Sequence, residues 1–328
     1  MLTYIMRRLA YMVVTIILIS MISFLIIKAP PGNFLTSIMQ ELRSQYGTEA
    51  QRRIVQLTQR YGLDQPGYKQ YLKWMQGIIL RGDFGRSFRE NRPVLDVLAE
   101  RLPYTLLIGL LTIFFQYTVG VAIGIYSALN QRTVGDYIFT FLAFIGRSIP
   151  NFLLALVIMF IFSSFLGWSV GGLFSPQFRE ASWSFSRIWD LILHLIPPVV
   201  VIGTAGTAGI VRVLRGTMLD ELGKEYVQTA RSKGIPEWKV ILRHPLKVAI
   251  LPIISTIGWQ LPRIFSGATI TAIVLNLPTV GSALYNSLLT QDMYLAGSIV
   301  LMFSTLTVIG TLISDILLAK IDPRIRYT

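Results

Sequence analysis

Six long apolar stretches divide the chain, and each is long enough to cross a membrane as a helix. A spanning α-helix needs about 20 predominantly apolar residues, because the hydrocarbon core of a bilayer is about 30 Å thick. The stretches are Leu9–Ile27, Tyr104–Leu129, Ile138–Phe165, Ile188–Val211, Val248–Leu275 and Leu295–Leu318. The pattern therefore predicts an all-α polytopic membrane protein with six transmembrane helices.

The first apolar stretch follows Arg7 and Arg8, which is also how a secretory signal peptide begins. The apolar core of a signal peptide is about 7–15 residues long, and this stretch is longer. It also meets Lys28-Ala29-Pro30-Pro31, where a signal peptide has a cleavage site of small residues. We therefore interpret residues 1–27 as a retained N-terminal transmembrane helix.

Lys and Arg in the connecting segments indicate the orientation, because cytoplasmic loops of membrane proteins carry an excess of both. Segment 212–247 holds eight of them and segment 276–294 holds none. If both termini are cytoplasmic, segment 212–247 lies inside and segment 276–294 lies outside. Segment 28–103 then also lies outside although it is rich in basic residues. It exceeds the length of about 60 residues within which loop charge sets orientation.

The chain is therefore expected to have three parts. Residues 1–27 form the N-terminal transmembrane helix, and residues 28–103 form an extracytoplasmic insertion that contains a turn at Gly82–Gly85. Residues 104–328 hold five transmembrane helices and the cytoplasmic loop 212–247.

Composition agrees with a membrane protein and argues against several other classes. Hydrophobic residues make up 53% of the chain and charged residues 14%, against about 25% charged in soluble proteins. The mean hydropathy of +0.57 is far from that of a disordered tail or a soluble enzyme. The net charge of +13 is typical of a membrane protein whose Lys and Arg hold loops on the cytoplasmic side, so we expect membrane lipid and no nucleic acid as a partner. The chain has no Cys, and therefore no disulfide or thiolate metal site.

Motifs for catalysis and metal binding are missing from the sequence. No Gly-x4-Gly-Lys-Ser/Thr loop is present to hold a nucleoside triphosphate, and no Gly-x-Ser-x-Gly tract is present to expose a nucleophilic serine. The two histidines, His194 and His244, have no second ligand at helical spacing. We expect no catalytic residue, no metal site and no cofactor on this chain, so any energy for transport comes from other subunits.

Loop 212–247 is too polar for the membrane and is patterned as two helices. Residues Asp220–Ser232 are good helix formers, with acidic residues early and basic residues late, as the helix dipole favours. Gly234 follows, where a left-handed residue often ends a helix. Pro236 then precedes a second helical stretch, Glu237–Leu246. The loop is expected to form an elbow of two helices, and the small Ala230 is expected to let another protein approach closely. An ordinary basic loop that only fixes the topology is the alternative.

The elbow resembles the "EAA" loop of ABC importer permeases. In the general pattern, Ala230, Gly234 and Leu246 match. The fuller tract Glu225-Tyr-Val-Gln-Thr-Ala-Arg-Ser-Lys-Gly234 is similar to the oligopeptide, dipeptide and nickel branch, in its B-subunit position. Other tracts extend the resemblance over the whole chain: Gly82-Asp-Phe-Gly-x-Ser87, Arg101-Leu-Pro-Tyr-Thr105, Ser148-Ile-Pro-Asn-Phe152 and Asp322-Pro-Arg-Ile-Arg-Tyr327.

The resemblance implies a type I ABC importer permease fold in the cell inner (cytoplasmic) membrane. It implies a second homologous permease subunit, two cytoplasmic ATP-binding subunits that hold ATP and Mg, and an extracytoplasmic solute-binding protein. The chain itself is then no enzyme, and 104–328 is its permease core. The residues that the resemblance assigns to ATPase coupling are Glu225, Tyr226, Thr229, Ala230 and Gly234.

Polar residues inside two apolar stretches are candidates for the translocation path. Charges within spans are costly and usually face a cavity or a partner, and prolines there free backbone groups beside water. An Arg that reaches the headgroups, or that pairs with a partner subunit, is the alternative. The candidate path residues are Arg147, Ser148, Asn151, Gln260 and Arg263.

The cargo and the mode of transport stay open at this point. Many relatives carry a Glu and a glycine where this chain has Ala272 and Thr279. This difference favours an oligosaccharide cargo, whereas the family also includes importers of peptides and metal complexes. An ion-coupled secondary transporter and a channel are the alternatives. A secondary transporter often shows inverted repeats and clustered intramembrane acids, and a channel has a selectivity filter. The sequence shows none of these features.

Overall fold

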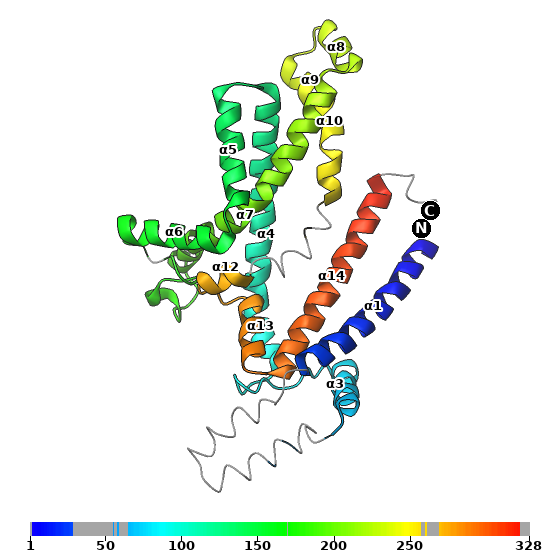
Figure 1. Cartoon of the computed structure of the whole chain (residues 1–328), viewed down its shortest axis with the longest axis vertical. Helices are drawn as coiled ribbons and strands as arrows, with labels where there is room; N and C mark the ends of the chain where they lie inside the picture. Colours follow the sequence, from blue (N-terminus) through cyan, green and yellow to red (C-terminus); the bar gives the residue numbers. More distant parts are fainter. Residues whose placement is uncertain are drawn as a thin grey trace. The chain divides into compact units, whose positions relative to one another are not determined.

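Helices make up the regular structure of the described part of the chain in the computed structural model (Figure 1). The structure describes residues 2–28, 55, 58, 65–168, 170–256, 260 and 269–321. The α-helices are α1 (Leu2–Lys28), α3 (Gly67–Arg81), α4 (Val94–Leu129), α5 (Val134–Ser148), α6 (Asn151–Leu166), α7 (Phe185–Leu222), α8 (Glu225–Ser232), α9 (Glu237–Arg243), α10 (Pro245–Ala249), α12 (Thr269–Val274), α13 (Val280–Leu289) and α14 (Met293–Ile321). A short 3-10 helix, η1, covers Pro176–Phe178. The predicted all-α class is confirmed.

Within the described residues, four helices are long and apolar enough to cross a membrane. The qualifying segments are Met6–Ile26, Val94–Leu129, Phe185–Leu222 and Met293–Leu312. They contain most of the first, second, fourth and sixth predicted stretches. Two of the helices extend well beyond the apolar stretch, because α4 begins at Val94 and α7 continues to Leu222.

The third predicted stretch is two helices rather than one, and this corrects the prediction. α5 and α6 meet at an angle of 109° across Ile149 and Pro150 (Figure 1). Pro150 cannot continue the hydrogen bonds of α5, because it has no N–H. It also pushes the residue before it out of the helical region, and Ile149 has φ −90° and ψ 128°. Counted as one broken span, the pair brings the number of candidate spans in the described part of the chain to five.

The fifth predicted stretch, Val248–Leu275, lies partly outside the described residues. Its beginning holds the end of α10 at Ala249 and, after a turn at Ile250, the helical residues 251–256, and its end contains α12. The predicted number of six spans and the cytoplasmic position of both termini remain predictions. The same holds for the division into 1–27, 28–103 and 104–328.

The chain folds as two compact units. The first comprises the described residues of 1–104, 279–313 and 319–328, and the second those of 105–278 and 314–318. α4 passes from the first unit into the second at Tyr104.

The core of the first unit joins α1, α3, α4, α13 and α14. Trp74 of α3 is buried at its centre and stacks on Phe24 of α1, with ring centroids 6.0 Å apart. The predicted turn after α3 depends on two glycines with positive φ. Gly82 ends the helix at φ 62°, and Gly85 at φ 90° lies so close to Tyr294 that an added Cβ would be 2.8 Å from the ring. Only glycine adopts a positive φ without strain, and only glycine leaves room for Tyr294 at position 85.

The core of the second unit is built on α7, against which α4, α5, α6 and α10 pack. Close helix contacts depend on small residues. A Cβ on Gly146 of α5 would be 2.7 Å from the Cβ of Thr204 of α7. Such small residues at helix contacts are typical of membrane-spanning helices, which associate through close packing.

Candidate functional site

The predicted elbow forms at the C-terminal end of α7 (Figure 1). α8 and α9 meet at Gly234, which has φ 71° and whose N–H donates to the carbonyl of Arg231 at 2.9 Å. An added Cβ at Gly234 would meet no atom within 4 Å, so the backbone conformation alone calls for glycine here. The predicted left-handed residue between two helices is therefore present.

The boundaries of the two predicted helices need correction. The first was expected over Asp220–Ser232, but α7 continues through Asp220 to Leu222, and α8 begins only at Glu225. The second was expected to reach Leu246, but α9 ends at Arg243. Pro245 starts the separate helix α10, because proline restricts the preceding residue and cannot donate a helical hydrogen bond.

The two short helices share an apolar interior. Val227 and Ala230 of α8 and Val240 of α9 are buried together, with Ile235 packed against them. Ala230 is only 5% exposed. Its small side chain therefore packs inside the elbow. The coupling role predicted for Ala230 remains a prediction.

Other predicted coupling residues lie on the outside of α8. Glu225, Tyr226 and Thr229 are exposed, and the hydroxyl of Tyr226 donates to the carboxylate of Glu221 at the end of α7. Desolvation of the phenol and the neighbouring carboxylate raise the pKa of Tyr226 to about 12. The face is therefore polar, and it holds a neutral tyrosine at physiological pH.

An ion pair that the sequence analysis did not foresee bridges the elbow. The guanidinium of Arg231 in the last turn of α8 lies 2.6 Å from the carboxylate of Glu237 in the first turn of α9. The hydrogen bond from Arg231 lowers the pKa of Glu237. Both side chains are exposed, so the pair orients the two helices more than it stabilises the fold.

Three candidate path residues lie together at the bend between α5 and α6. Arg147 and Ser148 end α5 and are exposed, and Asn151 begins α6 and is half-buried. The hydroxyl of Ser148 donates to the carbonyl of Phe144 at 2.9 Å. The candidate Gln260 is half-buried, whereas Arg263 lies outside the described residues. The role of all five in a path remains a prediction.

A second unforeseen ion pair links the beginning of α5 to α7. The guanidinium of Arg215 donates to both carboxylate oxygens of Asp136, at 3.1 and 2.8 Å. The side chain of Asp136 is 3% exposed and that of Arg215 is 29% exposed. Asp136 also accepts from the backbone N–H of Arg132 and the hydroxyl of Thr140. The pair lies seven residues before the end of α7, and so close to the elbow.

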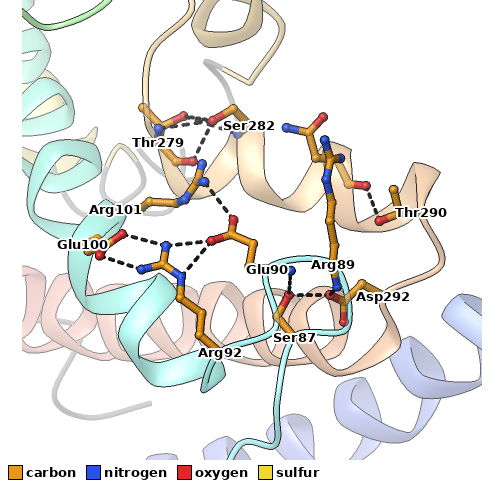
Figure 2. Close-up of polar contacts among 11 residues, drawn as sticks. Ser87, Arg89, Glu90, Arg92, Glu100, Arg101, Thr279, Ser282, Thr290 and Asp292 are labelled. Atoms are coloured by element: carbon orange, nitrogen blue, oxygen red, sulfur yellow. Dashed lines mark hydrogen bonds and ion pairs between the residues drawn. The ribbon is translucent and has the colours of Figure 1, made fainter. Parts of the chain in front are cut away.

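In the first unit, polar side chains tie loop 86–93 to α4 and to the start of α14 (Figure 2). Arg92 pairs with Glu90 and with Glu100, at 2.6 Å each, and Arg101 pairs with Glu90 at 2.9 Å. Asp292 is fully buried and accepts from the hydroxyl of Ser87 at 2.6 Å. These residues hold together two segments that are both expected on the extracytoplasmic side.

Thr279 and Ala272, which the sequence analysis related to the cargo, have structural positions. Thr279 is the N-cap of α13, and its side chain and that of Ser282 each bond to the other's backbone N–H. Ala272 of α12 is 2% exposed, so its methyl group packs in the interior.

His194 also has a structural position. It is 1% exposed, and its Nδ1 donates to the carbonyl of Asp190 at 2.8 Å, one turn earlier in α7. Among the described residues, no group of three His, Asp or Glu side chains is arranged to hold a metal ion.

Two protein-family models match the chain and together span nearly all of it. "Binding-protein-dependent transport system inner membrane component" matches residues 120–327. The model of the corresponding N-terminal region, "Binding-prot-dependent transport system membrane comp, N-term", matches residues 1–109.

Curated relatives cover the chain from end to end. It is 36% identical over 326 residues to the oligopeptide transport system permease protein AppB of Bacillus subtilis (strain 168), covering 99% of each chain. It is 33% identical to the dipeptide transport system permease protein DppB of Alkalihalophilus pseudofirmus and 32% identical to the oligopeptide transport system permease protein OppB of Haemophilus influenzae, covering 100% of each chain in both cases.

The several apolar helices, the elbow at the end of α7 and the full-length matches all indicate the same kind of protein. Permease subunits span the membrane, whereas ATP is hydrolysed by separate subunits of the transporter. The chain belongs to the family of binding-protein-dependent transport system inner membrane components, and is a multi-pass permease subunit of an ABC importer in the inner membrane.

Proposed function

We propose that this permease pairs with a second, homologous permease to form the path for peptides delivered by an extracytoplasmic binding protein. The peptide cargo is supported by relatives named as oligopeptide and dipeptide permeases that match over the full length. In this arrangement the chain has six spans with both termini in the cytoplasm. Arg147, Ser148, Asn151, Gln260 and Arg263 face the path.

The observation that carries the proposal is the elbow. α8 and α9 form one folded piece through their buried interior, and this piece is continuous with α7, the helix on which the second unit is built. Two cytoplasmic ATP-binding subunits, which hold ATP and Mg, bind the exposed face of α8 through Glu225, Tyr226 and Thr229. When these subunits close on ATP, their rigid-body motion moves the elbow and α7 together, and the permeases change between inward and outward access.

Gly234→Val tests the elbow, with Gly223→Val as its matched control. Valine at φ 71° is strained by about 1–2 kcal/mol, which corresponds to a change of about tenfold in an equilibrium constant. Gly223 has φ −82° and open space around it, so valine there adds the same bulk without that strain. We expect Gly234→Val to retain the second permease on co-purification but to bring down about tenfold less ATPase. Gly223→Val should behave like the wild type.

The co-purification also separates the proposal from its rivals. A secondary transporter or a channel needs no ATPase. If the tagged wild-type chain purifies alone and moves solute in vesicles without ATP, the proposed function is wrong.

The cargo is tested with the reconstituted complex and its binding protein. Uptake of labelled short peptides should depend on ATP and should be competed by unlabelled peptides and not by oligosaccharides. Uptake that only oligosaccharides compete would contradict the peptide assignment and would leave the permease assignment untouched.

A further inference from the structure

We propose that α3 is an interfacial helix that rests on the membrane surface, with one apolar stripe among the lipid chains and two lysines at anionic phosphate groups. This inference concerns the first unit alone and stands whether or not the proposed function is right. It rests on the contacts that fix α3 to its own unit, on the depth of these contacts along the span of α1, and on the side chains that α3 leaves exposed.

One face of α3 is fixed to the transmembrane helices of its own unit. Trp74 stacks on Phe24 of α1, and the ring of Tyr71 makes a T-shaped contact with Phe24 at a centroid distance of 5.5 Å. The hydroxyl of Tyr71 lies 2.7 Å from that of Ser20. Trp74 also fills the space beside Gly297 of α14, where an added Cβ would be 3.2 Å from the indole ring. α3 is therefore held in a defined orientation.

The contacts with α1 place α3 at the level of the membrane boundary. The apolar span of α1 ends at Ile26, and its contacts with α3 are made by Ser20 and Phe24. At a rise of 1.5 Å per residue, these contacts lie about 9 Å and 3 Å inside the end of the span. Interfacial helices bury their apolar face about 5–10 Å into the boundary between headgroups and chains. Tyr71 and Trp74 are also the residue types that favour this zone.

The opposite face of α3 leaves an apolar stripe exposed. Tyr68, Leu72 and Ile79 are 64%, 60% and 71% exposed. With 3.6 residues per turn, these three positions fall on one line along the helix, nearly opposite the buried Trp74. A water-facing stripe of this kind would cost free energy, whereas lipid chains would cover it. Leu80, in the last turn, is the other large apolar side chain that α3 exposes.

The charge of α3 favours a lipid surface as the occupant. Lys69 and Lys73 are exposed one turn apart on the line beside the apolar stripe, and Arg81 ends the helix. The helix carries no Asp or Glu. A basic helix with an exposed apolar flank, at the end of a span, matches a layer of anionic phosphate groups above apolar chains.

Spin labels at single cysteines test this inference directly, because the chain has no native Cys that would react. Leu72→Cys and Ile79→Cys place the label on the stripe, and Lys73→Cys, exposed about 100° around the helix from Leu72, is the control off the stripe. Each variant is labelled in the assembled transporter, in vesicles of phosphatidylethanolamine and phosphatidylglycerol. We expect the labels at 72 and 79 to collide more with oxygen than with a water-soluble nickel chelate, at a depth of about 5–10 Å. The label at 73 should collide more with the nickel chelate.

Two results would overturn the inference. Labels at 72 and 79 that collide mainly with the nickel chelate would place the stripe in water. Immobile labels that meet neither reagent would show that a protein surface covers the stripe, and adding or removing the binding protein would tell whether it is that partner. In vesicles of phosphatidylcholine alone, the labels should move towards the surface, because the lysines lose their anionic partners. An unchanged depth would overturn the role assigned to Lys69 and Lys73.

Discussion

Replacing Arg215 with Met is expected to destabilise the second unit by about 3–5 kcal/mol, because it leaves the carboxylate of Asp136 buried without its cation. The side chain of Asp136 is 3% exposed, and the guanidinium of Arg215 is its partner for both oxygens. The loss should be seen as a lower melting temperature of the purified transporter. Asp136→Asn should cost less, because Arg215 is 29% exposed and reaches water, and because the amide keeps one oxygen as an acceptor.

Two controls separate the ion pair from a general effect of the substitution. The double variant Asp136→Asn with Arg215→Met should recover most of the loss, because no charge is then left buried. Arg212→Met makes the same change three residues earlier on α7, where the side chain is exposed and lies over the ring of Phe144. It should cost at most about 1 kcal/mol, which is the usual value of an exposed cation–π contact. Equal melting temperatures for the Arg212 and Arg215 variants would contradict the prediction.

The position of the pair also predicts a functional effect. It joins α7, which continues into the elbow, to α5, which ends at the bend with Arg147 and Ser148. We expect the Arg215 variant to keep its ATPase subunits on co-purification while its rate of transport falls more than its rate of ATP hydrolysis. A parallel fall of both rates would indicate a structural role alone.

The transmembrane helices were predicted well from the sequence where the length of an apolar stretch alone determines the structure. Leu9–Ile27 and Leu295–Leu318 are apolar over the thickness of a bilayer, and a helix satisfies every backbone group inside lipid. The elbow was predicted for a similar reason, because Gly234 between two helix-forming tracts indicates a left-handed residue. The start of the elbow was less well predicted. Hydropathy marks the end of the apolar part of α7, whereas the helix itself continues further.

The features that were missed depend on neighbours far away in the chain. Asp136 and Arg215 are 79 residues apart, and Ser87 and Asp292 are 205 apart. Nothing in the local pattern relates the members of either pair. The break at Pro150 was missed for another reason: prolines are tolerated inside membrane helices, so the residue alone does not distinguish a small kink from the 109° bend observed.

Replacing Asp292 with Ala is expected to cost about 2–4 kcal/mol of stability in the first unit, from the loss of a helix cap and of partners for buried donors. Oδ1 accepts from the backbone N–H of Leu295 at the start of α14, at 3.2 Å. Oδ2 accepts from the hydroxyl of Ser87 at 2.6 Å and from the N–H of Arg89 at 3.2 Å (Figure 2). Asp292→Asn keeps the cap and the shape and is the matched control. The stability loss of Asp292→Asn should be smaller than that of Asp292→Ala. The loss of Ser87→Ala should also be smaller, because it removes only one of these three bonds to Asp292, together with the bond that the Ser87 hydroxyl accepts from the N–H of Glu90.

The pH dependence of the same group gives a second test of its burial. Burial raises the pKa of Asp292, and the hydrogen bonds from Ser87 and the backbone only partly oppose this shift. The folded state then holds the proton more tightly than the unfolded state. The stability that this group contributes is fully present below its ordinary pKa and is lost as the pH rises through the raised value. The melting temperature of the wild type, taken relative to Asp292→Asn, should therefore fall as the pH rises from acid towards neutral, because asparagine does not titrate. A difference that rises over this range would show that the hydrogen bonds outweigh burial and that Asp292 is held as a stabilised carboxylate.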